Sequence, residues 1–124
     1  MRSVLIVHPN SHIANGLADM LDGVLEELYL NPSEVLTANS LAEATDLTQK
    51  RGVSLMLLDA DLLTNATQAS HLQLPGVSRK RVLLVRDSQL KKGRETIKKR
   101  VFSALLRMPI ERERLKYLLV SMLS

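Results

Sequence analysis

Two aspartates separated by a single residue are the first candidates for chemistry in this sequence. Asp59 ends an apolar run that begins at Val53, and Asp61 follows two positions later. Paired carboxylates could act as a general acid and base, or could hold a hard cation. No nucleophile, second base or glycine-rich loop accompanies them, so the pattern does not predict catalysis. We therefore expect a protein that is not an enzyme.

The histidines do not indicate a metal site. His8 and His12 are four residues apart, but the Pro9-Asn10 pair between them interrupts any helix, and His71 is remote. The chain contains no cysteine. A zinc site needs three or four clustered nitrogen, sulfur or oxygen ligands. The five glycines are scattered and form no nucleotide-binding motif. We expect neither a metal nor a cofactor.

Charge is distributed unevenly along the chain, whose net charge is +4. Residues 1–62 hold three basic and nine acidic side chains, whereas residues 63–124 hold fourteen basic and four acidic ones. Such polarity favours an acidic protein partner, a nucleic acid or a second copy of the chain. The expected partner surface lies in the densest basic segment and consists of Lys91, Lys92, Arg94, Lys98, Lys99 and Arg100.

Aromatic content bears on the choice between these partners. The chain has two Tyr, one Phe and no Trp, too few for a surface on which nucleic-acid bases stack. The basic side chains of the segment lack acidic neighbours one helical turn away, except for Glu95, so their mutual repulsion is poorly offset. We favour contact with a protein, and contact with a polyanion remains an alternative.

Length and composition indicate one cytoplasmic domain over residues 1–124. Apolar residues make up 45% and charged residues 24%, as in folded globular proteins rather than disordered ones. No apolar run reaches the roughly 18 residues that a membrane span requires. The segment Met1–Val7 is too short for a signal peptide, because His8-Pro9 follows it directly. A chain without cysteine can form no disulfide, which fits a cytoplasmic protein.

Apolar runs alternate five times with segments of helical periodicity. The expected strands are Val4–Val7, Glu34–Ala38, Val53–Leu58, Val82–Val85 and Val101–Leu106. These runs are mostly continuous, which is typical of parallel strands covered on both faces. The pattern therefore predicts an α/β fold of (βα)5 order, a doubly wound sandwich around a five-stranded parallel sheet. The expected helices run from the N-cap Ser11 to Tyr29, from the N-cap Ser40 to Lys50, over Asn65–Leu72, over Ser88–Arg100 and onward from Pro109.

Three segments at the expected carboxyl ends of strands carry a family resemblance. They are Val4–Asn10, Leu55–Leu62, which contains Asp59, and Leu105–Ile110. In these motifs, and in the gaps between them, the sequence resembles the receiver domains of bacterial response regulators, which share the flavodoxin-like fold of CheY. The resemblance covers the whole chain and implies that Asp59 stands at the phosphoacceptor position.

The resemblance also implies a phosphorylation pocket that this sequence does not complete. The family has an acidic pair, a hydroxyl residue, an aromatic residue and a lysine where this chain has other side chains. Mg²⁺ prefers oxygen ligands, usually carboxylates, and only Asp59 and Asp61 remain to supply them. We expect Arg86 or His8 to lie within hydrogen-bond reach of Asp59. The positions at which this chain differs from the family pattern are His8, Pro9, Arg86, Leu105 and Met108.

The expected function is that of a pseudo-receiver, a non-enzymatic interaction domain of a bacterial regulator that works without phosphorylation. A weaker resemblance around Ala104–Met122 is to the degenerate receivers that begin NtrC-type flagellar regulators, which implies transcriptional control. Similar receivers also precede ATPases that localise pilus machinery. Two other classes remain as alternatives: a functional receiver phosphorylated at Asp59, and a small basic nucleic-acid-binding protein.

A partner surface follows from the same resemblance. In ordinary receivers the fourth helix, fifth strand and fifth helix form the partner and dimer face, which here is the basic half of the chain. We expect a homodimer, or a contact with an effector domain or another protein, through the region between about Leu90 and Met122. As an alternative, this surface could contact the acidic first helix of a second copy, which carries Asp19, Asp22, Glu26 and Glu27.

Overall fold

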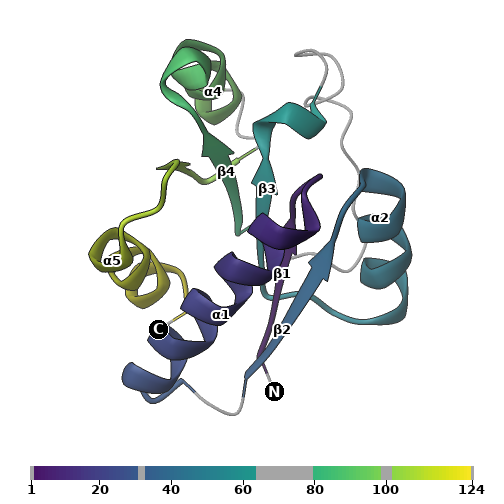
Figure 1. Ribbon diagram of the computed structural model, residues 1–124, viewed down its shortest axis with the longest axis vertical. Helices are drawn as coiled ribbons and strands as arrows, with labels where there is room; N and C mark the ends of the chain where they lie inside the picture. Colours follow the sequence, from purple (N-terminus) through teal and green to yellow (C-terminus); the bar gives the residue numbers. More distant parts are fainter. Residues whose placement is uncertain (1, 31–32, 64–79, 99–101, 124) are drawn as a thin grey trace.

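The chain forms one five-stranded parallel sheet with helices on both faces (Figure 1). The computed structural model describes residues 2–30, 33–63, 80–98 and 102–123. Strand order is β2-β1-β3-β4-β5. This confirms the predicted α/β sandwich with the flavodoxin-like sheet. The helix predicted over Asn65–Leu72 lies outside the described residues, as do Lys99 and Arg100 of the predicted basic surface.

The elements follow one another in the predicted order. The strands are β1 (Arg2–Val7), β2 (Ser33–Ala38), β3 (Leu55–Asp59), β4 (Arg81–Val85) and β5 (Ala104–Arg107). The described helices are α1 (Ser11–Glu27), α2 (Leu41–Lys50), α4 (Leu90–Lys98) and α5 (Arg112–Leu123). Single turns of 3₁₀ helix follow β3 at Ala60–Leu62 and precede α4 at Asp87–Gln89.

The N-caps of the first two helices are defined by side-chain hydrogen bonds. At α2, the Oγ atom of Ser40 accepts from the backbone N–H of Glu43 at 3.1 Å, which confirms Ser40 as the N-cap. At α1, Asn10 is the N-cap, because its side chain accepts from the N–H of Ile13 at 3.2 Å. The prediction of Ser11 was wrong by one residue. Asn and Ser are about equally good N-caps, so adjacent candidates cannot be separated by residue type.

Most of the other described boundaries also differ from the predicted ones by one to three residues, including the following three. α1 ends at Glu27, because Tyr29 adopts the left-handed conformation with φ of 57°. β5 begins at Ala104 rather than at residue 101. The last helix begins at Arg112 rather than at Pro109, whose peptide bond with Met108 is cis and lies before the helix.

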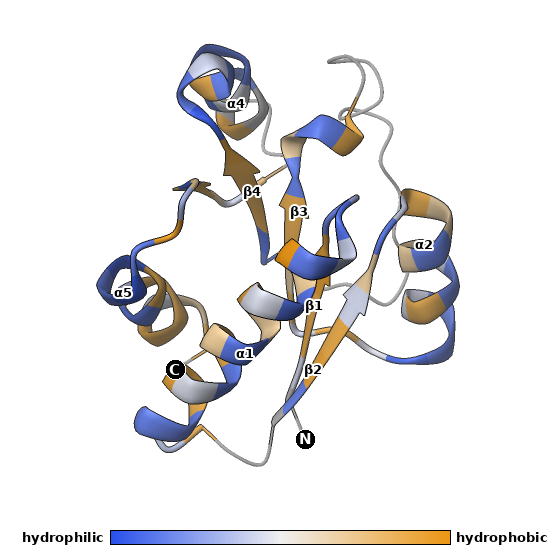
Figure 2. Ribbon diagram, in the orientation of Figure 1, coloured by the Kyte–Doolittle hydropathy of each residue, from blue (hydrophilic) through white to orange (hydrophobic). Residues whose placement is uncertain are grey.

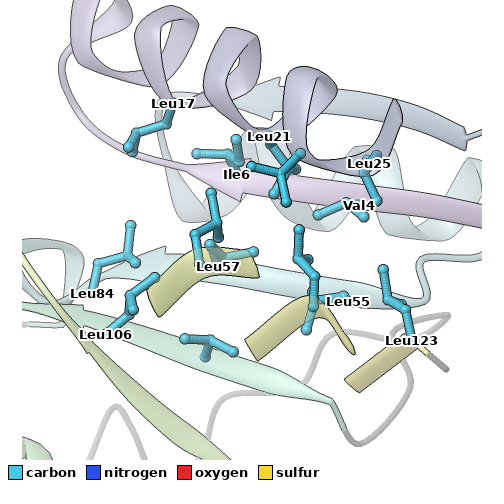
Figure 3. Close-up of a cluster of buried hydrophobic side chains, with 14 residues drawn as sticks. Val4, Ile6, Leu17, Leu21, Leu25, Leu55, Leu57, Leu84, Leu106 and Leu123 are labelled. Carbon is cyan, nitrogen blue, oxygen red and sulfur yellow. The ribbon is translucent and has the colours of Figure 1, made fainter. Parts of the chain in front are cut away.

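Two apolar clusters hold the helices to the sheet. Side chains alternate between the faces of a strand, so Val4 and Ile6 of β1 lie in one cluster and Leu5 and Val7 in the other. The first cluster packs α1 and α5 against the sheet (Figure 3). The second packs α2 and α4 on the opposite face. Figure 2 shows the hydrophobic central strands between helices of mixed polarity, of which α4 is among the most hydrophilic.

Candidate functional site at the carboxyl edge of the sheet

The register of the central strands brings His8 and Asp59 together. β1 and β3 are parallel, with Val7 opposite Leu58. The next positions along these strands are His8 and Asp59, at the edge where ligands bind in open α/β sheets. Side chains alternate along a strand, so both residues point to the face covered by α1 and α5. The sheet therefore places an imidazole beside the carboxylate at the predicted site.

The His8 imidazole and the Asp59 carboxylate are both buried, with relative exposures of 8% and 4%. The Nδ1 atom of His8 accepts a hydrogen bond from the backbone N–H of Asn10 at 3.0 Å. A neutral His8 therefore carries its proton on Nε2, which faces Asp59. Nε2 lies 3.8 Å from Oδ2 of Asp59, a distance too long for a hydrogen bond. The two side chains therefore interact through space, and His8 acts to lower the pKa of Asp59.

The Asp59 carboxylate is poorly compensated for its burial. Its Oδ2 atom is buried and has no hydrogen-bond partner among the described residues. Burial is the main cause that raises the pKa of Asp59 above its ordinary value, and the negative charge of Asp61 adds to the rise. His8, the backbone N–H of Asp61 and the more distant Arg86 oppose that rise without cancelling it. The site thus favours the protonated form of Asp59 more than water does.

Arg86 binds Asp61 instead of Asp59. Its Nη2 atom lies 2.7 Å from Oδ1 of Asp61, which also accepts from Nε2 of Gln89 at 2.7 Å. The Oε1 atom of Gln89 accepts from the backbone N–H of Arg86 at 2.9 Å. This network joins the ends of β3 and β4. Asp59 therefore forms a hydrogen bond with neither Arg86 nor His8, and the prediction that one of them would do so is wrong.

The other predicted pocket positions supply no charge to the site. Met108 is partly buried and packs against the apolar cluster beneath α1 and α5. Its backbone N–H donates to the carbonyl of Val85 at 2.8 Å, which continues the pairing of the last two strands. Pro9 is exposed. Leu105 packs with the cluster on the opposite face, beneath α4.

The donor atoms at this edge do not fit a Mg²⁺ ion. Asp59 faces an imidazole N–H, and the nearby carboxylate of Asp61 is already engaged by Arg86 and Gln89. Mg²⁺ requires near-octahedral oxygen coordination, usually with one or two carboxylates free to bind it. Within the described ranges, no group of three or more His, Cys, Asp or Glu side chains could hold a metal ion.

We expect the Arg86→Ala substitution to have a small effect on stability. The Arg86–Asp61 pair is exposed, at 60% and 41% of the two side chains, and exposed pairs contribute about 1 kcal/mol or less. Urea unfolding should show a loss of less than about 1 kcal/mol that shrinks further in high salt. Lys50→Ala on exposed α2 is the control. A loss several times larger would mean that the network holds the sheet edge together.

A second candidate surface lies over α4, β5 and α5. A groove of about 690 Å³ runs along it, and apolar side chains of all three elements line the groove together with Arg94 and Arg107. β5 is the last strand of the sheet. Gly93 allows α4 to approach closely, because a Cβ atom there would lie 3.1 Å from the side chains of Leu105 and Val85. The apolar lining includes Leu90, Leu105, Tyr117 and Leu118.

Part of the predicted basic surface lies on this second candidate surface. Lys91, Lys92 and Arg94 are exposed on α4, and Lys98 is its last residue.

Among the helices that the structure describes, none is long and apolar enough to cross a membrane.

Solved structures with the same architecture include signal receiver domains. A receiver domain from Clostridium thermocellum matches with a TM-score of 0.76 and 16% identity, over 98% of this chain and 94% of that one. The receiver domain of an HD domain-containing protein from Pseudomonas fluorescens matches with the same TM-score, 24% identity and the same two coverages. The chain has the receiver-domain fold.

A third similar structure is a putative pilus assembly protein (cpaE) from Burkholderia thailandensis. It matches with a TM-score of 0.71 and 18% identity, over 98% of both chains. At these identities the likeness concerns the fold, so the chemistry has to be argued from the residues at the sheet edge. No protein-family model matches the chain, and no curated protein sequence matches it either.

Proposed function

We propose that this chain is a pseudo-receiver, which keeps the receiver scaffold and acts through protein contacts without phosphorylation or catalysis. The observation that carries the proposal is the environment of Asp59. Its carboxylate is buried beside the Nε2–H of His8, and its Oδ2 has no hydrogen bond within the described part of the chain. Met108 packs into the apolar core where the family resemblance implies a lysine.

Phosphoryl transfer makes demands that this edge of the sheet does not meet. The transferred group carries negative charge on its oxygens, and metal ions and cationic side chains stabilise that charge in the transition state. Asp59 has one free carboxylate oxygen in a buried, poorly solvated position. The guanidinium of Arg86, which acts on Asp59 from a distance, is bound to Asp61. A functional receiver phosphorylated at Asp59 is therefore the less favoured candidate.

The proposed contact surface is the face formed by α4, β5 and α5, through which the chain would dimerise or dock to an effector domain or a separate protein. Two observations support it: the groove of about 690 Å³ and the exposed basic side chains of α4 beside it. One role is regulation of a linked effector domain, such as that of a transcription regulator. Pilus assembly is a second candidate, because two similar structures are of putative pilus assembly proteins from Burkholderia.

The proposal predicts that acetyl phosphate does not modify Asp59 and that beryllofluoride does not bind there, with or without Mg²⁺. His8 and Pro9 stand where the acids that would hold the ion are expected. Met108 stands where the lysine that would neutralise the phosphoryl group is expected. Intact-mass spectrometry of the treated chain measures the modification directly. Amide NMR spectra with and without beryllofluoride test binding of the mimic.

A receiver domain with a complete acidic pair, treated in parallel, shows that the reagents work. The Asp59→Asn variant identifies any modification elsewhere in the chain. Stoichiometric modification of the wild-type chain that requires Mg²⁺ and disappears in the Asn variant would overturn the proposal and establish a functional receiver. The nucleic-acid alternative predicts binding through α4 that weakens steeply with salt, and an electrophoretic shift assay distinguishes it.

A further inference from the structure

Three basic side chains of α4 have no acidic partner among the described residues. Lys91, Lys92 and Arg94 are exposed, and in the described part of the chain they form no hydrogen bond or ion pair. Elsewhere among the described residues, six basic side chains pair with acidic ones: Arg51, Arg86, Arg107, Arg112, Arg114 and Lys116. The exposed side chains Lys91, Lys92 and Arg94 of α4 are here called the basic face. Arg94 is on the side of α4 that lines the groove, and Glu95 is the one exposed acid beside Lys91 and Lys92 on the described part of this helix.

α1 presents the opposite charge. Asp19, Asp22 and Glu26 are exposed at intervals of three and four residues, so they lie on one side of the helix. Over the residues that the structure describes, none of the three has a basic partner. α1 itself contains no Lys or Arg. Asp19, Asp22 and Glu26 are here called the acidic face.

The fold keeps these two faces apart. α1 packs on the apolar cluster of one side of the sheet, and α4 packs on the cluster of the other side. Figure 1 shows the two helices separated by the central strands. One chain therefore cannot bring its own acidic face against its own basic face. The two charges can meet only between different molecules.

The positions of the faces also decide which symmetry such a contact could have. In an isologous dimer the same surface of each copy meets its equivalent, which would bring two basic faces or two acidic faces together. A symmetric dimer could also pair α1 of each copy with α4 of the other copy. That would need α1 and α4 to lie on one continuous surface of the chain, whereas they lie in opposite layers. A heterologous contact, basic face to acidic face, pairs opposite charges without either conflict.

The spacing of the charges is matched on the two helices. Asp19 and Asp22 are three residues apart on α1, and Lys91 and Arg94 are three residues apart on α4. Each pair is therefore separated by about 4.5 Å along its helix axis. Gly16 lies one turn before Asp19, with no atom of another element within 4 Å of where its Cβ would be. This leaves room for a second helix beside α1.

We propose that the basic face of one copy docks on the acidic face of a second copy, so that the chain associates head to tail. The inference rests on the proposed function as a protein-contact domain and names a second copy of the chain as the partner. Exposed ion pairs contribute little each, so the association is weak and decreases as salt screens the charges. Each added copy leaves a free face at either end, so growth beyond a dimer follows.

The experiment uses two sets of neutralising substitutions. The first set, Lys91→Gln, Lys92→Gln and Arg94→Gln, removes the charge of the basic face. The second set, Asp19→Asn, Asp22→Asn and Glu26→Gln, removes that of the acidic face. A matched control neutralises one acid and one base on the exposed surface of α2, Asp46→Asn and Lys50→Gln. Sedimentation velocity at low salt, over a wide range of protein concentration, measures the association.

We expect the sedimentation coefficient of the wild-type chain and of the α2 control to rise with concentration beyond that of a dimer. Each face variant alone should remain monomeric. An equimolar mixture of the two face variants should form a heterodimer and nothing larger, because the mixture contains one intact pair of faces. High salt should dissociate both the wild-type assembly and the heterodimer.

Two results would overturn the inference. If the acidic-face variant associates like the wild-type chain while the basic-face variant does not, the contact is isologous through α4, β5 and α5, and the proposed function stands. If the wild-type chain remains monomeric at every concentration at low salt, the head-to-tail contact does not exist. The proposed function is tested by a separate experiment, in which Mg²⁺-dependent modification of Asp59 would contradict it.

Discussion

At neutral pH the Asp59→Asn variant is expected to be more stable than the wild-type chain, on the order of 1 kcal/mol, because Asn buries a polar group at this position but no negative charge. Burial raises the pKa of Asp59 above its ordinary value of 3.8, so folding binds a proton in the range between the two values. The free energy of unfolding of the wild-type chain therefore falls as pH rises through that range, and it stays lowered above it.

The Asn variant has no titrating group at residue 59, so its advantage should be complete at pH 7 and should vanish below about pH 3.8. Urea unfolding at several pH values measures the difference. Asp46→Asn, the same change at an exposed position of α2, should leave stability nearly unchanged at every pH. If the Asp59→Asn variant is instead less stable at neutral pH, then attraction by His8 outweighs the burial of the carboxylate.

Restoring acids beside Asp59 should have a second large effect. The His8→Asp/Pro9→Asp variant gains two carboxylates, one of them opposite Asp59 in the sheet register. Crowding like charges at a buried edge is expected to lower the free energy of unfolding by about 3–5 kcal/mol in the presence of EDTA. Millimolar Mg²⁺ should recover part of this loss, because an ion that binds only the folded state stabilises it.

Thermal unfolding with EDTA and with increasing Mg²⁺ tests this expectation. The melting temperature of the double variant should rise with the concentration of Mg²⁺, while that of the wild-type chain should not change. The His8→Asn/Pro9→Asn variant places side chains of similar size without charge and should show no response to the ion. A wild-type chain that Mg²⁺ stabilises would contradict our view that its sheet edge lacks the ligands.

The parallel sheet was predictable because its central strands are buried on both faces. All five residues of β3 are buried, and Leu55–Leu58 appear in the sequence as an unbroken apolar run before Asp59. The same signal misplaced the start of β5. Phe102 is buried against the cluster beneath α4, and it extends the apolar run before the strand begins at Ala104. Burial without strand pairing cannot be distinguished from a strand by hydrophobicity alone.

The composition of the site was predictable, but its contacts were not. Strand ends are visible in the sequence, so His8, Asp59 and Arg86 could be assigned to one sheet edge. Which of them meet depends on the sheet register and on the reach of Arg86, whose guanidinium binds the half-exposed Asp61 at less desolvation cost than the buried Asp59. Gln89 was not predicted, because no spacing rule marks an uncharged residue that completes such a network.

The strand order has a consequence for the synthesis of the chain on the ribosome. β1 and β2 are adjacent in the sheet, β3 lies on the other side of β1, and β4 and β5 follow on that same side in chain order, so the strands can pair in the order in which they are synthesised. No strand has to insert between two that are already paired, so the sheet can assemble as the chain emerges. α5 is different, because its ion pairs with Glu27 of α1 span 85 and 89 residues. A nascent chain that stalls before Arg112 would leave the apolar side of α1 partly uncovered, and that segment is where we expect chaperones to bind.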